Sequence, residues 1–120
     1  MFKELNSTKT IKEGINLEDL EFRKLKEFIG EDLAVDGFFF TNGDYGEQLV
    51  VVARTLGKVH AITQGAYKVN MPNRAINQFK QIRDNRDMLN AVLEGHLMIT
   101  GIEEGKVGRG VTTLYTLADC

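Results

Sequence analysis

The side chains of this sequence most able to do chemistry are aromatic rings and cations that share its central and C-terminal segments. Phe38–Phe40 are three consecutive phenylalanines, so both faces of a strand formed by them present aromatic surface. Bases of a single-stranded nucleic acid stack on such rings, and cations contact its phosphates. The residues predicted to combine these two chemistries are Phe38, Phe40, Tyr45, Arg54, Lys58, Tyr67, Lys68 and Arg109.

The three phenylalanines are expected to point to two opposite faces of the strand. Phe39 is predicted to lie in the core, together with Leu33 and Val35, and Phe38 and Phe40 point to the opposite face. That second face is either core in a closed barrel or an exposed platform. Tyr45 is the strongest candidate for stacking, because the loop Thr41–Gly46 offers a side chain few core neighbours.

Motifs of catalysis and metal binding are missing from the sequence. The two histidines, His60 and His96, are not at the spacing of metal ligands. The segment Gly105–Gly110 is glycine-rich, but a strand is expected after it, where a phosphate-binding loop needs a helix. Acidic pairs beside turns are expected to be solvated surface. We therefore predict a protein that is not an enzyme, with no catalytic residue, metal or cofactor.

Periodicity predicts the elements that position these residues. A strand from Leu33 to Phe40 and a second over Gln48–Arg54 form a hairpin. A third strand is expected over Val59–Val69, after a turn at Gly57. Helical spacing over Asn70–Gly95 predicts a helical segment, whose basic residues are interpreted as a solvated face. These residues are Arg74, Lys80, Arg83 and Arg86.

Two further strands are predicted after the helical segment, over Leu97–Ile102 and Val111–Leu117, with a charged loop at Glu103–Gly110 between them. The N-terminal 14 residues are expected to form an arm. A short helix is expected to follow and end at Gly30, with a strand over part of this segment as the competing interpretation.

The order of three strands, a helical segment and two strands predicts a mainly β fold, a five-stranded oligonucleotide-binding (OB) barrel. Residues 1–30 are expected to pack on it as the arm and short helix, and residues 31–120 to form the barrel. An antiparallel meander with a helix elsewhere, or an α+β sandwich, shares this order. The glycine within the first strand, Gly37, favours the barrel, because that strand must curve.

Composition restricts the class of protein further. The chain has 120 residues and a net charge of −2, which counts against binding of duplex DNA through charge alone. The only cysteine, Cys120, cannot form an internal disulfide and fits a reducing cytoplasm. No signal peptide and no apolar run of membrane-spanning length is recognisable, so neither is expected. We expect a cytoplasmic protein that does not bind membranes, and self-association is left open.

Several segments resemble small single-stranded DNA-binding OB-fold proteins of phages and conjugative plasmids of Gram-positive bacteria. They are Gly37–Thr41, Tyr45–Gln48, Asn70–Arg74 continuing through Ile82–Asn85, and Thr112–Cys120. The resemblance covers about residues 30–120 and implies an OB fold, no cofactor, and a role in DNA replication or transfer of the mobile element in a bacterial host cell. It assigns no binding residue.

Two functions therefore compete. The first is non-catalytic binding of single-stranded DNA. The second is a protein-binding module on the same fold, such as an inhibitor of a host protein, which the acidic balance and the lack of a basic stripe favour. An exposed patch of Phe38 and Phe40 without nearby cations would favour the second function.

Overall fold

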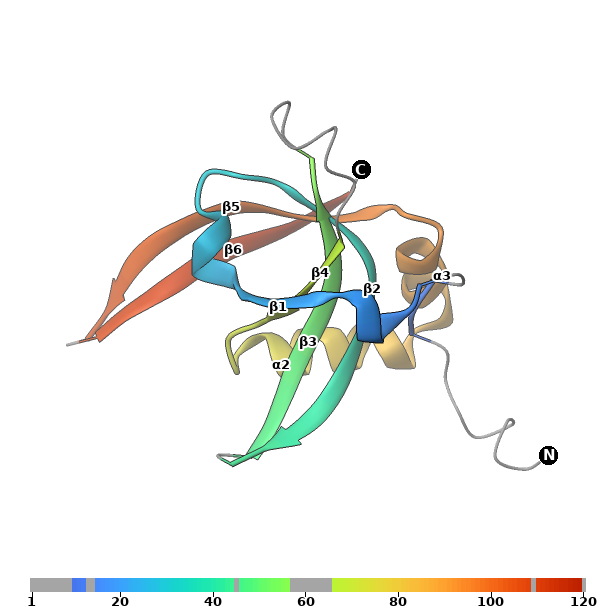
Figure 1. Cartoon of the computed structure of the whole chain (residues 1–120), viewed down its shortest axis with the longest axis horizontal. Coiled ribbons are helices and arrows are strands. Elements are labelled where there is room, and N and C mark those ends of the chain that lie inside the picture. The colour runs from blue at the N-terminus through green and yellow to red at the C-terminus, as the bar shows by residue number, and fades with distance from the viewer. Residues whose placement is uncertain (1–9, 13–14, 45, 57–65, 109, 120) are drawn as a thin grey trace.

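The computed structural model describes residues 10–12, 15–44, 46–56, 66–108 and 110–119. These residues form a mainly β fold, in which one six-stranded sheet curls into a half-barrel with the order β1-β4-β3-β2-β5-β6 (Figure 1). The strands are β1 (Glu21–Lys24), β2 (Leu33–Gly43), β3 (Gly46–Thr55), β4 (Ala66–Asn70), β5 (Leu97–Val107) and β6 (Gly110–Asp119). The helices are α2 (Ala75–Asp84) and α3 (Arg86–Leu93), with 3₁₀ turns η1 (Leu17–Asp19) and η2 (Leu25–Phe28).

Two long antiparallel hairpins dominate the shape. Figure 1 shows the β2–β3 hairpin extending towards the bottom of the view and the β5–β6 hairpin towards the left. The first hairpin confirms the prediction, but β2 continues to Gly43, which pairs with Gly46. Likewise β5 continues to Val107, and Glu103–Val107 of the segment predicted as a loop pair with β6. The predicted loops Thr41–Gly46 and Glu103–Gly110 are therefore mostly strand, because paired backbone satisfies its hydrogen bonds.

A bulge in β2 decides which phenylalanine enters the core. Val35 pairs with Ala53 and Gly37 with Val52, so Asp36 is an extra residue in the ladder. An extra residue reverses the alternation of side chains beyond it. Leu33 and Val35 consequently share the core with Phe38, which is fully buried. The predicted core position of Phe39 was wrong: Phe39 lies half-buried on the other face.

The core lies between the concave face of the sheet and the helices. The Phe38 ring meets that of Phe79, on α2, edge to face, with ring centroids 5.0 Å apart. Leu49 and Val51 from β3 and Val92 from α3 lie in the same cluster. These contacts hold α2 behind the β2–β3 hairpin, as seen in Figure 1.

The predicted helical segment is confirmed between β4 and β5. Its break at Asp84–Asn85 separates α2 from α3, and the Asn85 side chain caps α3 by accepting a hydrogen bond from the Met88 amide, 3.1 Å. Neither Asn70 nor Asn73 caps α2, which begins after Arg74 with no side-chain cap. The side-chain amides of both asparagines are therefore not used in capping this helix.

The segment before β2 differs from its prediction. The expected short helix is absent between Glu21 and Phe28, where β1 pairs in parallel with β4 and is followed by η2. The competing interpretation, a strand over part of this segment, is confirmed for Glu21–Lys24. Leu25 and Phe28 of η2 belong to the core, so this segment is part of the sheet and its packing.

Residues 10–12 form a further contact with β2 at Gly37. The Phe38 amide donates to the Thr10 carbonyl, 3.0 Å, and the Lys12 amide donates to the Asp36 carbonyl, 2.9 Å. A Cβ on Gly37 would lie 2.5 Å from the Ile11 Cα. The absence of a side chain at Gly37 therefore permits the close approach of two backbones.

We expect Gly37→Ala to lower the free energy of unfolding by about 1–2 kcal/mol, because the colliding atoms are backbone and residues 10–12 must shift. The Lys12 and Phe38 amides should lose protection from hydrogen exchange, which measures the pairing directly. In the control variant Ile11→Ala the backbone approach persists, and protection should remain. Unchanged protection in Gly37→Ala would show that this pairing does not need a glycine.

Part of the predicted third strand lies outside the described residues, which resume at Ala66 and confirm β4 from there to Asn70. In the described part of the chain, no helix has both the length and the apolar character needed to cross a membrane.

Candidate nucleic-acid interface

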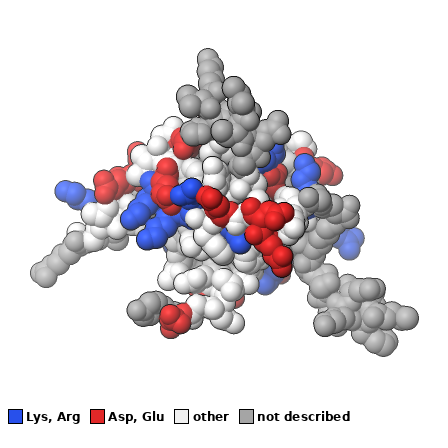
Figure 2. Space-filling model, in the orientation of Figure 1, with Lys and Arg blue, Asp and Glu red and all other residues white. Residues whose placement is uncertain are grey.

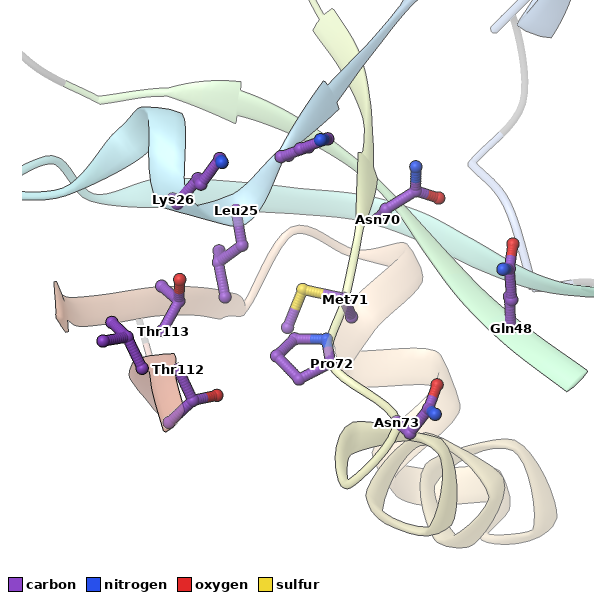
Figure 3. Close-up of a pocket in the computed structure, with 11 residues that line it drawn as sticks. Leu25, Lys26, Gln48, Asn70, Met71, Pro72, Asn73, Thr112 and Thr113 are labelled. Atoms are coloured by element: carbon purple, nitrogen blue, oxygen red, sulfur yellow. The ribbon is translucent and has the colours of Figure 1, made fainter. Parts of the chain in front are cut away.

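A cleft opens between the two hairpins, where the β1–β4 side of the curled sheet approaches β6. Its first cavity has a volume of about 390 Å³. Figure 3 shows side chains from η2 and β6 on one side of it, and those from the β4–α2 connection on the other. The lining residues are Lys24, Leu25, Lys26, Gln48, Asn70, Met71, Pro72, Asn73, Val111, Thr112 and Thr113.

The register of the sheet brings the polar lining residues together. Lys24 of β1 lies opposite Asn70 of β4, and Asn70 lies opposite Val50 of β3. Leu49 points into the core, so its neighbour Gln48 points to the other face. Gln48, Asn70 and Lys24 thus come from three adjacent strands and share the convex face of the sheet at one end.

The local structure of η2 explains why two lysines border this cavity. Leu25 and Phe28 turn into the core, so Lys24 and Lys26 on either side of Leu25 remain exposed. The Glu27 carboxylate accepts a hydrogen bond from the Lys24 backbone amide, 2.7 Å, which stabilises the turn. Both lysines therefore line a cavity whose own lining contains no acidic side chain.

The chemistry of this lining suits a ligand that carries several negative charges and also has groups that donate and accept hydrogen bonds. Two lysines supply positive charge, three amides donate and accept hydrogen bonds, and two threonines supply hydroxyls. Figure 2 shows lysines and arginines over η2 and the adjacent end of β1 with acidic atoms among them, and a further acidic group to the right, over η1 and the start of β1. The charge of this surface is therefore mixed, and it is the cavity lining itself that lacks acidic side chains.

Arg74 crosses the cleft at the end of the first cavity. Its Nη1 donates to the Thr112 Oγ1, 3.0 Å, and its Nη2 donates to the Thr113 carbonyl. Its guanidinium carbon lies 5.3 Å from the centre of the Tyr115 ring, within range of a cation–π contact. Arg74 therefore joins the start of α2 to β6.

Beyond Arg74 lies a second cavity of about 550 Å³, lined by Arg74, Gln78, Leu114, Tyr115, Thr116 and Leu117. The Tyr115 hydroxyl donates to the Gln78 Oε1. Burial raises the pKa of this hydroxyl above its ordinary value, and the nearby Arg74 cation opposes the rise. Tyr115 therefore remains a neutral hydrogen-bond donor at neutral pH.

The structure does not bring the residues predicted from sequence into one site. Phe38 is fully buried, so its prediction as a binding residue was wrong, and the physical reason is the bulge at Asp36. Phe40 is half-buried and packs against the core. The Arg83 guanidinium carbon and the Lys80 ammonium lie 5.3 Å and 5.9 Å from its ring centre. An exposed patch of Phe38 and Phe40 without nearby cations is therefore not present.

Arg54 forms an ion pair with the buried carboxylate of Asp36. Its Nε and Nη2 donate to the two oxygens of Asp36, at 2.6 Å and 3.1 Å. The hydrogen bond, and then the charge of Asp36, raise the pKa of Arg54 above its ordinary value. Arg54 thus neutralises the buried Asp36, a structural role that sequence reasoning did not anticipate.

Tyr67 and Lys68 point to opposite faces of β4. Tyr67 packs against the core beside Phe28, with 5.6 Å between ring centroids. The Lys68 ammonium lies 4.2 Å from the ring centre of its cross-strand partner Phe22. Tyr45, Lys58 and Arg109 lie outside the described residues, and their roles stay predictions.

The cations of α2 are more than the predicted solvated face. Arg74 bonds to β6, and Lys80 and Arg83 lie beside Phe40. Lys80 also forms an ion pair with Glu47 of β3, 2.6 Å. Arg74 and Arg86 are exposed as predicted, although Arg74 also contacts β6, whereas Lys80 and Arg83 are half-buried.

Sequence reasoning missed most of the cleft, because its lining comes from segments far apart in the chain. The polar residues not predicted are Lys24, Lys26, Gln48, Asn70, Asn73, Thr112 and Thr113. The one signal in the sequence was Lys24-Leu25-Lys26, two cations on either side of a core residue. That signal was obscured because the same segment also fits helical spacing.

Comparisons of this chain with protein-family models, with curated proteins and with solved structures find no match. Within the described residues, no group of three or more His, Cys, Asp or Glu side chains is placed to hold a metal ion.

Proposed function

We propose that this protein binds single-stranded DNA without catalysis, and that the strand lies in the cleft between the two hairpins. The observation that carries the proposal is the lining of the first cavity, where cations, amides and hydroxyls meet without an acidic side chain. Lysines there would contact phosphates, and the amides would face base edges. Single strands suit a narrow site with few cations better than a duplex with two phosphate backbones.

The fold proposed for this function is an OB-type barrel made of β2 to β6. The order β4-β3-β2-β5-β6, with helices between β4 and β5, supports it. OB barrels bind oligonucleotides on the face of their second and third strands, between the first and last hairpin loops. Here β3 and β4 are the second and third strands and supply Gln48 and Asn70, and β1 is an addition beside β4.

The biological setting follows from the resemblance of residues 30–120 to phage and plasmid proteins. We propose that the protein supports DNA replication or transfer of such an element, in the cytoplasm of its bacterial host. Coating of exposed single strands during copying requires affinity without strong sequence preference, which charge and stacking provide.

Removing both lysines of the cleft tests the proposal. The double variant Lys24→Gln, Lys26→Gln should bind a labelled oligo-dT less tightly than the parent. Its slope of log affinity against log salt should be shallower by about 1.4, at roughly 0.7 for each phosphate that is no longer neutralised. Fluorescence anisotropy over a range of salt concentrations measures both quantities.

A matched double variant, Lys12→Gln with Arg86→Gln, removes the same charge from exposed residues outside the cavities, and should leave the slope within a few tenths of the parent. Equal reductions of slope in both double variants would mean that the cleft is not the site. No salt-dependent binding by the parent would reject the function and favour the protein-binding module.

A further inference from the structure

The cleft does not end at Arg74. The first cavity is lined by Val111–Thr113 and the second by Leu114–Leu117, so the two follow one another along β6. Their opposite wall is also continuous, since Asn70–Asn73 line the first and Arg74 and Gln78 the second. Seven residues of β6 span about 20 Å at roughly 3.3 Å per residue. A bound strand that runs along β6 would follow a path from the first cavity, over Arg74, to the second.

Arg74 lies where that path passes from one cavity to the other. Two different nitrogens of its guanidinium hold the Thr112 hydroxyl and the Thr113 carbonyl, and its central carbon lies over the Tyr115 ring. Donors on two nitrogens fix the plane of the group as well as its position. The side chain nevertheless remains exposed, so a fixed planar cation is presented to solvent.

We propose that the guanidinium plane of Arg74 is a stacking platform for one base of the bound strand, at the junction of the two cavities. The inference rests on the proposed function and names a specific recognition residue within it. Unpaired bases stack on arginine planes as well as on aromatic rings. The base would lie above Arg74, backed by Tyr115, with Leu117 as an apolar neighbour on the same face of β6.

The contacts of Arg74 are compatible with stacking. Two of its five N–H donors, one on Nη1 and one on Nη2, are used by β6, and these bonds hold the guanidinium in place. Stacking leaves both hydrogen bonds intact. The exposed lysines beside the first cavity are not held to β6 in this way and are suited to contact phosphates. Base stacking and phosphate contacts would thus lie at different places along the cleft.

Arg74→Lys tests the platform, because lysine keeps the charge and loses the plane. We expect oligo-dT to bind this variant about tenfold more weakly, with an unchanged salt slope. A second oligonucleotide, with abasic sites in place of its bases, keeps every phosphate. The ratio of affinities for the normal and abasic strands should fall about tenfold from parent to variant, as a double-mutant cycle requires for a base contact.

Arg83→Lys is the matched control, because Arg83 also lies 5.3 Å from an aromatic ring centre, that of Phe40, but lines neither cavity. It should bind both strands like the parent, and melting temperatures identify any variant that is unfolded.

Three outcomes would overturn the inference. If Arg74→Lys binds like the parent, the platform is rejected while the proposed function stands. If it loses affinity equally for normal and abasic strands, Arg74 contacts the backbone and the platform is again rejected. If the parent binds neither strand, the proposed function fails and the platform fails with it.

Discussion

Replacing Phe38 by alanine is expected to lower the free energy of unfolding by about 3–5 kcal/mol, the range for a buried phenylalanine. The Phe38 side chain is 0% exposed and contacts two other rings, with centroids 5.0 Å away for Phe79 and 5.9 Å away for Phe40. Its removal leaves a cavity between β2 and α2, which cannot close without moving the helix. Urea denaturation followed by circular dichroism measures the change in stability.

Phe39→Ala is the control for this prediction, because it removes the same atoms one residue further along β2. Phe39 is half-buried and lies outside the core cluster, so its replacement should cost about 1 kcal/mol. A larger effect for Phe39→Ala than for Phe38→Ala would mean that the alternation of β2 continues without a bulge, with Phe39 rather than Phe38 in the core.

Arg54→Ala is expected to lower the free energy of unfolding by about 2–3 kcal/mol, because it leaves the Asp36 carboxylate buried without its cation. Asp36 is 4% exposed. The Arg54 side chain is 47% exposed, so solvent weakens the pair and the expected effect lies below that of a fully buried ion pair. The measurement is again denaturation by urea, at a pH near neutrality.

The reciprocal variant Asp36→Asn should cost less, about 1 kcal/mol, since it leaves a half-exposed arginine that water can solvate. The slope of log affinity for oligo-dT against log salt should not change in Arg54→Ala, because Arg54 lines neither cavity. A slope reduced by about 0.7 with unchanged stability would instead identify Arg54 as a phosphate contact, as the sequence pattern indicates.

Local patterns in the sequence were sufficient for the elements with strong periodicity. The run Gln48–Arg54 and the helical spacing from Ala75 to Leu93 predicted β3, α2 and α3 in the right order. Helical spacing also suggested a helix through Phe22, Leu25 and Phe28, where the structure has β1 and η2. Pairing with the exposed edge of β4 overrode that local preference, and no signal within such a short segment reveals a partner more than 40 residues away.

The faces of β2 show how one residue changes the outcome. Strict alternation would place Phe39 on the core face with Leu33 and Val35. Because of the bulge at Asp36, Phe38 occupies that face instead. The bulge accompanies contacts made elsewhere in the fold: the ion pair of Asp36 with Arg54, and the approach of Ile11 to Gly37. A period-two pattern contains neither contact, so the binding role of Phe38 could be corrected only from the structure.

The sequence by itself determined a mainly β chain, the β2–β3 hairpin and the helices between β4 and β5. These are properties of neighbouring residues, and local sterics and periodicity decide them. Only the tertiary structure decided which phenylalanine is buried, which arginine is neutralised, and where Lys24, Asn70 and Thr113 meet. Those properties depend on contacts between segments far apart in the chain, whose geometry is set when the sheet curls and its β1–β4 side approaches β6.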